Sequence, residues 1–275
     1  MAMPKSINTS LSNKKPAWSR LKTVALPASY GSWSLVSEPL LLGLLAAPSW
    51  PGLLLAAAGL LTFLLNQPFK IILTDRQRGR QYARTRLAWR VAFLYLLLLA
   101  VCLLAFIWLV GWRPLLPLAL AIPLLLVFII YDSRPGRSWQ AELAAPTAFS
   151  AIAAAIPLAA GWDLAPALAL WVIMSARADP AVLYVRARLR LAKGQAARLG
   201  PAIGAHLLAL AAVAILTVLN LAPPTALFAF LILLLRAALG LSPWRRDYAP
   251  MTLGWIETAF GLFTVLLVAL GYWIF

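Results

Sequence analysis

The sequence predicts an all-α polytopic membrane protein with nine transmembrane helices, its N-terminus inside the cell and its C-terminus outside. Three observations lead to this fold class. Of the 275 residues, 63% are hydrophobic and 12% are charged, whereas about 25% are charged in a soluble domain. The apolar residues form runs of about 20, the length of helix that crosses a bilayer. The basic residues concentrate in alternate connections between those runs, as the positive-inside rule requires.

The nine predicted spans follow one another with short connections. Residues 1–29 precede them as a basic segment that we expect to be mobile, and it lacks the apolar stretch of a secretory signal. Residues 30–275 form a single transmembrane domain. The spans cover residues 31–48, 51–73, 90–111, 114–131, 144–161, 165–185, 201–221, 224–241 and 252–275. Several of them begin near a proline, which is tolerated in the first turn of a helix.

The placement of charge orients the predicted bundle. The connections after the first, third, fifth and seventh spans contain one basic residue, Arg113, and the other basic residues lie on the opposite side or in the half of a span nearest to it. The positive-inside rule assigns that side to the cytoplasm. It also accounts for the net charge of +16 without nucleic acid, for which the chain has no recognition module. The single cysteine, Cys102, excludes an internal disulfide and zinc sites built from several cysteines.

Ionisable residues within the spans are few, and all of them fall in the predicted cytoplasmic halves. The ionisable ones are Glu38, Lys70, Arg177, Asp179, His206, Arg236 and Glu257, and Asn66 and Gln67 add two amides. Intramembrane ionisable residues usually face the interior of the bundle or a wet cavity. The distribution therefore predicts a polar chamber that opens to the cytoplasm.

A simpler role is the alternative for several of these residues. Lys70 and Arg236 lie close enough to the ends of their spans to extend to the lipid headgroups. Glu38 and Glu257 lie in early turns, from which they could reach water. His206 could hydrogen-bond a neighbouring helix. For Arg236 and His206 we favour this structural interpretation.

Arg177 and Asp179 lie deeper in the sixth predicted span, immediately before Pro180. A proline removes a backbone donor and kinks a helix, so the sequence predicts a polar break here. Such breaks occur where they are buried in protein or line a cavity. We favour a functional pocket at this position over a purely structural arginine–aspartate pair.

A cluster of arginines after the second span suggests an anionic ligand. Arg76 and Arg78 follow Asp75 in the stretch DRQRGR, and guanidinium groups bind phosphate through paired hydrogen bonds. We expect the anionic head to meet Lys70, Arg76, Arg78 and Arg177. The alternative is that this loop only sets topology, and for the loop alone that interpretation is favoured. Phosphate-binding glycine loops and the serine-hydrolase motif are absent from the sequence.

Four stretches resemble the YwiC-like family of bacterial membrane proteins. They are YGSWSLVSEPLLLG (30–43), AEL (141–143), ARADPAVLYVRARLRL (176–191) and LGWIETAFGLF (253–263). The opening stretch has tyrosine and serine where the family usually has histidine and alanine. The resemblance covers most of residues 28–270 and implies a protein of the bacterial cytoplasmic membrane, without specifying an activity.

The span count and the two basic loops also resemble the UbiA-type intramembrane prenyltransferases, which implies a UbiA-like bundle. That family holds magnesium and a prenyl diphosphate on aspartate-rich motifs after spans 2 and 6. Here the first motif would fall on Asn66, Gln67 and Lys70, and the second would retain only Asp179. Asp75 and Asp179 could supply two carboxylates for magnesium. The positive charge of Lys70, Arg76 and Arg177 disfavours that metal.

These observations lead to three functional hypotheses. The first is a membrane protein that binds an anionic-headed amphiphile, such as an isoprenoid phosphate or a lipid. The second is a divergent transferase acting on an isoprenoid or quinone precursor, with Asp75 or Asp179 as the catalytic carboxylate. The third is a transporter or an accessory subunit of a membrane complex. The expected ligand-binding residues are Glu38, Asn66, Gln67, Lys70, Arg76, Arg78, Arg177, Asp179, His206 and Glu257.

Overall fold

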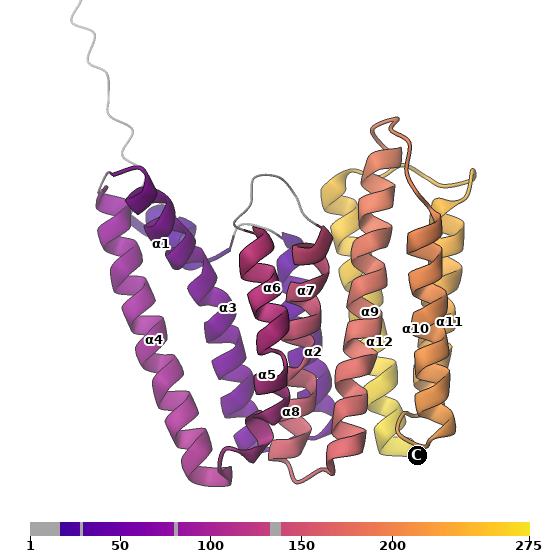
Figure 1. Cartoon of the computed structure of the whole chain (residues 1–275), viewed down its shortest axis with the longest axis horizontal. Coiled ribbons are helices and arrows are strands. Elements are labelled where there is room, and N and C mark those ends of the chain that lie inside the picture. The colour runs from indigo at the N-terminus through magenta and orange to yellow at the C-terminus, as the bar shows by residue number, and fades with distance from the viewer. Residues whose placement is uncertain (1–16, 28–29, 80–81, 133–138) are drawn as a thin grey trace, which may run out of the picture.

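The computed structural model describes residues 17–27, 30–79, 82–132 and 139–275. Within these ranges the chain consists of helices and their connections, with no strand. Figure 1 shows the helices standing side by side in one bundle. The predicted all-α fold class is therefore confirmed.

The N-terminal part contributes four helices, α1 (Ala17–Ala25), α2 (Tyr30–Ala46), α3 (Trp50–Gln77) and α4 (Ala83–Val110). The sequence did not predict α1, a short helix that packs against α3 and α4. Its Val24 is buried in an apolar cluster with Leu65 and Ile72 of α3 and Ala88 of α4. Residues 1–16 lie outside the described residues, so for them the predicted mobility stays a prediction.

The middle of the chain contains two interrupted helical segments. The first comprises η1 (Arg113–Leu115), α5 (Leu116–Leu120) and α6 (Ile122–Asp132), and the second comprises α7 (Trp139–Ser150) and α8 (Ile152–Ala159). The break after α7 has a local cause. The Ser150 hydroxyl donates to the Pro146 carbonyl at 2.8 Å, and the Ala151 amide bonds the Ala148 carbonyl, three residues back instead of four. A serine that bonds back to the preceding turn bends a helix in this way.

The C-terminal part contributes α9 (Leu164–Leu191), α10 (Gly200–Val218), α11 (Pro224–Leu241) and α12 (Pro250–Ile274). Pro180 lies inside α9, which continues as one α-helix on both sides of it. The predicted polar break in this span is therefore wrong. A helix absorbs a proline when its neighbours pack around the site, and Pro180 is buried.

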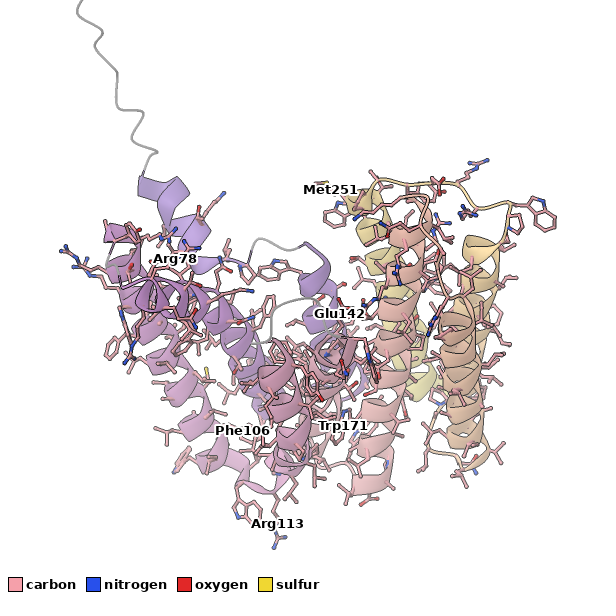
Figure 2. All side chains as sticks on the ribbon, turned by 45° about the horizontal axis from the view of Figure 1, so that its top comes forward. Arg78, Phe106, Arg113, Glu142, Trp171 and Met251 are labelled. Atoms are coloured by element: carbon pink, nitrogen blue, oxygen red, sulfur yellow. The ribbon has the colours of Figure 1, made fainter. Side chains whose placement is uncertain are left out.

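In the described part of the chain, eight helical segments are long and apolar enough to cross a membrane, and a shorter apolar helix covers Trp33–Ala46. These segments confirm a polytopic membrane protein, while the count of nine and the orientation stay predictions. In Figure 1 the connections after α3, α9 and α11 lie at one end of the bundle, and the short turns and the C-terminus lie at the other. Arg78 and Arg113 mark these two ends in Figure 2.

The centre of the bundle is formed by α8, which packs against α2, α3 and α9. Its residues Ile152 and Ile156 are buried in a cluster with apolar residues of α2 and α3. Two glycines let the helices approach each other. A Cβ at Gly43 would meet Ile156, and a Cβ at Gly59 would meet Ile152. By contrast, α4 lies at the edge of the bundle, mainly against α3 and α1, and its Phe106 reaches the cluster around Ile152 and Ile156.

Candidate functional site

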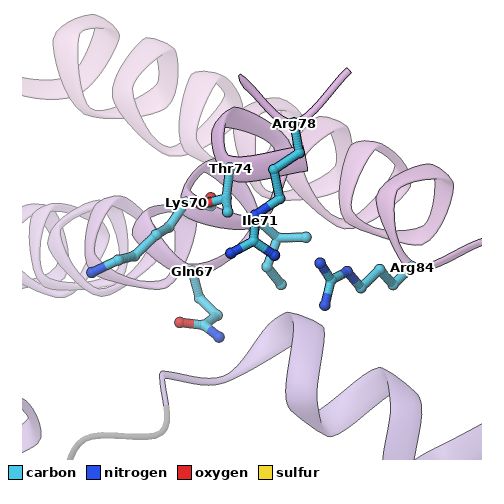
Figure 3. Close-up of a pocket in the computed structure, with 6 residues that line it drawn as sticks. All are labelled: Gln67, Lys70, Ile71, Thr74, Arg78 and Arg84. Atoms are coloured by element: carbon cyan, nitrogen blue, oxygen red, sulfur yellow. The ribbon is translucent and has the colours of Figure 1, made fainter. Parts of the chain in front are cut away.

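A surface pocket of about 230 Å³ lies at the end of the bundle where α3 meets α4. Figure 3 shows the residues that line it, which are Gln67, Lys70, Ile71, Thr74, Arg78 and Arg84. All but Arg84 come from the last three turns of α3 and the residue that follows them. In Figure 3 the guanidinium groups of Arg78 and Arg84 extend into the same space, while the ammonium of Lys70 extends to one side.

Hydrogen bonds hold two of the polar groups of this pocket in place, one to α1 and one within α3. The Gln67 amide nitrogen donates to the Thr23 carbonyl of α1 at 3.1 Å. The Thr74 hydroxyl donates to the Lys70 carbonyl at 2.7 Å. Lys70 and Arg78 are exposed and, among the described residues, neither forms an ion pair. Two cations without a carboxylate partner can receive an anion directly.

Asp75 is fully buried beneath this pocket and joins α3 to α4. Its carboxylate accepts hydrogen bonds from Arg84 Nε at 3.1 Å and Arg84 Nη2 at 2.5 Å. It accepts a third from the Thr85 hydroxyl at 2.6 Å. The Tyr82 amide also bonds the Thr85 hydroxyl, which closes the first turn of α4. The acid that we considered a catalytic candidate is thus engaged in a structural contact that orients Arg84.

Two other predicted residues of this region lie outside the pocket lining. Asn66 and Arg76 are exposed on α3, and neither contributes to the pocket. Successive side chains of a helix point about 100° apart, so not all polar residues of one stretch can share a face. The prediction from sequence spacing included both residues because it did not separate the faces of α3.

A second set of predicted residues forms an ion-pair network buried inside the other half of the bundle. Arg177 of α9 donates from Nη2 to Glu38 Oε1 of α2 at 3.1 Å and to the Glu257 carbonyl of α12 at 2.8 Å. The side chains of Arg177 and Glu38 are only 2% and 1% exposed. The network thus connects three helices that are far apart in the sequence.

Arg236 of α11 extends this network. Its Nη1 lies 2.9 Å from Glu257 Oε1, and both side chains are 8% exposed. Its guanidinium also lies 4.1 Å from the centre of the Tyr184 ring and 5.4 Å from that of Phe260. The favoured role at the lipid headgroups is therefore wrong for Arg236, because a buried carboxylate and two aromatic faces hold it within the bundle.

His206 of α10 lies beside the network without joining it through a hydrogen bond. Its Nδ1 bonds the Ala202 carbonyl of the same helix at 2.8 Å. Its ring meets that of Tyr184 edge-on, with 6.4 Å between centroids. The His206 side chain is buried. We had expected it to hydrogen-bond a neighbouring helix, but its hydrogen-bond partner lies on its own helix.

Asp179 faces a different neighbour from Arg177, although the two residues are only two positions apart on α9. Its carboxylate accepts from the Thr147 hydroxyl of α7, with 2.9 Å to each oxygen. The Trp171 indole donates to the Thr147 carbonyl at 2.8 Å. Asp179 thus fastens α9 to α7, while Arg177 fastens α9 to α2 and α12.

The structure divides the predicted site residues into two groups and adds others. Gln67, Lys70 and Arg78 line the surface pocket, whereas Glu38, Arg177 and Glu257 form the buried network. Thr74, Ile71, Arg84, Thr147 and Tyr184 were not predicted. A count of helical turns from Lys70 could have found Thr74, which lies one turn further along α3. Among the described residues, no three His, Cys, Asp or Glu side chains are grouped closely enough to hold a metal ion.

The apolar helices and the buried charges between them define an integral membrane protein of several spans. Residues 26–157 match the model of the YwiC-like protein family, so this region of the chain is similar to that family. The match covers the stretches at 30–43 and 141–143, while the resemblance at 176–191 and 253–263 stays a prediction. No curated protein and no solved structure matches the chain. The resemblance to UbiA-type prenyltransferases likewise stays a prediction.

Proposed function

We propose that this protein binds an amphiphile with an anionic head, such as a phospholipid or an isoprenoid phosphate, at the surface pocket between α3 and α4. The observation that carries the proposal is that Lys70 and Arg78 both line one pocket of about 230 Å³. That volume falls below the ~300 to 1,000 Å³ of pockets that enclose a whole drug-sized ligand. It suits a phosphate head whose tail remains outside.

The surroundings of the pocket suit such a ligand. Ile71 lines the pocket, and Phe69 and Leu73 are exposed on the same stretch of α3. These side chains offer apolar contacts to an acyl or isoprenoid tail. Because Arg84 is held by the buried Asp75 carboxylate, its guanidinium is positioned before any ligand arrives, and this reduces the ordering cost of binding.

Lipid retention by the purified full-length chain tests this proposal. The measurement is native mass spectrometry after exchange into detergent containing phosphatidylglycerol, or alternatively geranylgeranyl phosphate. Arg78→Ala and Lys70→Ala each remove one cation of the pocket. We expect about a ten- to hundredfold loss of affinity for the preferred ligand, as for a lost hydrogen bond between charged groups.

Matched controls lie at the same end of the bundle. Arg190 and Lys193 are exposed near the end of α9, so Arg190→Ala and Lys193→Ala remove the same charges from another basic segment. The proposal predicts that these two variants keep the ligand. Equal loss of the ligand in all four variants would contradict the pocket, because it would show that the basic residues attract anions only through their overall positive charge. Unchanged retention in Arg78→Ala and Lys70→Ala would also contradict the pocket.

A further inference from the structure

The buried network contains more polar atoms than its own contacts satisfy. Glu38, Arg177, Arg236 and Glu257 are all less than one-tenth exposed. Among the described residues, seven of their buried side-chain atoms have no hydrogen-bond partner. They are Glu38 Oε2, Arg177 Nε, Arg236 Nε, Nη1 and Nη2, and Glu257 Oε1 and Oε2. Buried polar atoms in folded proteins are nearly always bonded, to protein or to ordered water.

Two of these atoms, Arg236 Nη1 and Glu257 Oε1, face each other in the ion pair, which leaves three donors and two acceptors of the cluster without any partner. A ligand that satisfies both kinds must donate and accept, as water does, and a buried water typically makes about three hydrogen bonds to such groups. Carboxylates in contact with water inside a membrane are typical of proton pathways. We propose that the network is a hydrated site within the bundle, at which Glu257 takes up and releases a proton.

The contacts of the two glutamates favour Glu257 over Glu38 as the proton acceptor. Glu38 Oε1 accepts a hydrogen bond from Arg177 at 3.1 Å. Both oxygens of Glu257 lack a hydrogen bond, and its contact with Arg236 is an ion pair alone. A proton from water can therefore bond to a Glu257 oxygen without displacing a donor already in place.

Proton uptake raises the charge of the site by one, because the carboxylate becomes a neutral carboxyl group and both arginines keep their charge. Arg236 then loses its counter-charge. It keeps a second stabilising contact, since its guanidinium lies against the Tyr184 and Phe260 rings, and aromatic faces attract cations. Arg177 has instead the carboxylate of Glu38 and the carbonyl of residue 257 as its partners. The network can thus exist with Glu257 charged or neutral.

Charged groups on three other helices act on the Glu257 carboxylate. They are Glu38 of α2, Arg177 and Arg188 of α9, and Arg236 of α11. Tyr184 of α9 and His206 of α10 lie next to this set, Tyr184 against Arg236 and His206 against Tyr184. The basic end of the bundle is the end at which the connections after α3, α9 and α11 lie. Arg188 is buried in the last turn of α9, near this end, and donates to the Gly240 carbonyl at 2.5 Å. It also donates to the Arg246 carbonyl in the loop that precedes α12. Arg177, Tyr184 and Arg188 are spaced seven and four residues apart, which places them on one face of α9. This face leads from the network towards the basic end of the bundle.

Infrared difference spectroscopy of the reconstituted full-length chain tests the proposal. Spectra at stepped pH values, in H₂O and in D₂O, detect the C=O stretch of a protonated carboxyl group. We expect a band that appears as pH falls, shifts in D₂O, and is lost in Glu257→Gln. Retention of the band in Glu38→Gln would support the assignment. So would its retention in Asp179→Asn, the control at a half-buried carboxylate outside the network. Loss in Glu38→Gln with retention in Glu257→Gln would overturn it.

A second measurement keeps the test valid if Glu257→Gln fails to fold. The chain has three glutamates, Glu38, Glu142 and Glu257, and Glu142 forms a half-exposed ion pair with Arg186. Incorporation of ¹³C-labelled glutamate must shift the carboxyl band of the wild-type protein. In Glu257→Asp the carboxyl group at position 257 carries no label, so the shifted band must be absent. The absence of a protonated-carboxyl band at every pH at which the protein stays folded would overturn the proposal. Neither result depends on lipid binding at the α3–α4 pocket.

Discussion

Arg177 and Glu38 form a hydrogen-bonded ion pair, 3.1 Å long and almost fully buried, across 139 residues of sequence. The pair connects α2 to α9, and Arg177 also reaches the backbone of α12. One arginine therefore joins a helix of the YwiC-like region to two helices that lie outside residues 26–157.

Arg177→Ala should destabilise the fold strongly, because it leaves Glu38 as an uncompensated charge within the bundle. Removal of one partner of a buried ion pair typically costs about 3 to 5 kcal/mol. The measurement is unfolding of the detergent-solubilised protein by heat or by increasing dodecyl sulfate. The double variant Glu38→Gln/Arg177→Gln should recover part of this loss, since neither residue then carries a charge. The single variants Glu38→Gln and Arg177→Gln complete the comparison. If their separate losses of stability added up to the loss in the double variant, the two residues would not be coupled.

Gly261→Ala should disturb the same network from α12. A Cβ at this position would collide with Glu38 Oε1 and Arg177 Nη2, and overpacking of this kind costs about 1 to 3 kcal/mol. Gly254→Ala is the matched control, because it lies on the same helix with no atom within 4 Å of the added Cβ. There alanine should be neutral or stabilise the helix by up to about 1 kcal/mol. Equal effects of both substitutions on the unfolding midpoint would contradict the close packing at Gly261.

Asp75→Asn separates a structural role from a catalytic one. The substitution removes the charge that fixes Arg84 and replaces one carboxylate oxygen with a donor, so the α3–α4 contact should weaken and the unfolding midpoint should fall. Asp247→Asn is the control, because Asp247 is 62% exposed and lies 3.7 Å from Arg245. Incubation with prenyl diphosphates, with and without magnesium, should give no product with either the wild type or the variant. Product formed by a well-folded wild type and lost in Asp75→Asn would favour the transferase hypothesis.

Val24→Asp should detach α1 from the bundle. Val24 is 3% exposed and packs between α3 and α4, so a carboxylate there would be buried without a partner. Amide hydrogen exchange at residues 21–26 should increase, and the hydrogen bond from Gln67 to the Thr23 carbonyl should be lost. Leu26→Asp, at a position that is 41% exposed, should leave exchange nearly unchanged. Slow exchange retained in Val24→Asp would show that α1 is held by other contacts.

The hydropathy of the sequence predicted where the helices lie more accurately than it predicted which helices contact each other. The predicted span at 224–241 coincides with α11, Pro224–Leu241, whereas the span predicted at 90–111 is α4, which begins seven residues earlier at Ala83. The polar first turns of α4 extend beyond the apolar run, so hydropathy could not place its start. α1 was missed because a nine-residue helix stabilised by packing carries little signal of its own.

The partners of the buried charges could not be predicted in the same way. The position of Arg236 near the end of α11 suggested an extension to the headgroups, yet Glu257 lies on a different helix and holds it inside. The position of Arg177 deep in its span could be read from the sequence, while its pairing with Glu38 depends on how α2 and α9 pack. Single-helix reasoning gives the depth of a residue along its own axis but not the neighbour that it will meet.

The wide sequence separation of Glu38 and Arg177 has a consequence for synthesis of the chain. Glu38 enters the membrane with α2, and its partner is translated 139 residues later, a delay on the order of ten seconds at ordinary elongation rates. Until then a carboxyl group must remain in or near lipid without a counter-charge, which favours its neutral form. Insertion of α9 and α12 would then draw the early helix into its final place, so the last third of the chain completes the assembly of the first.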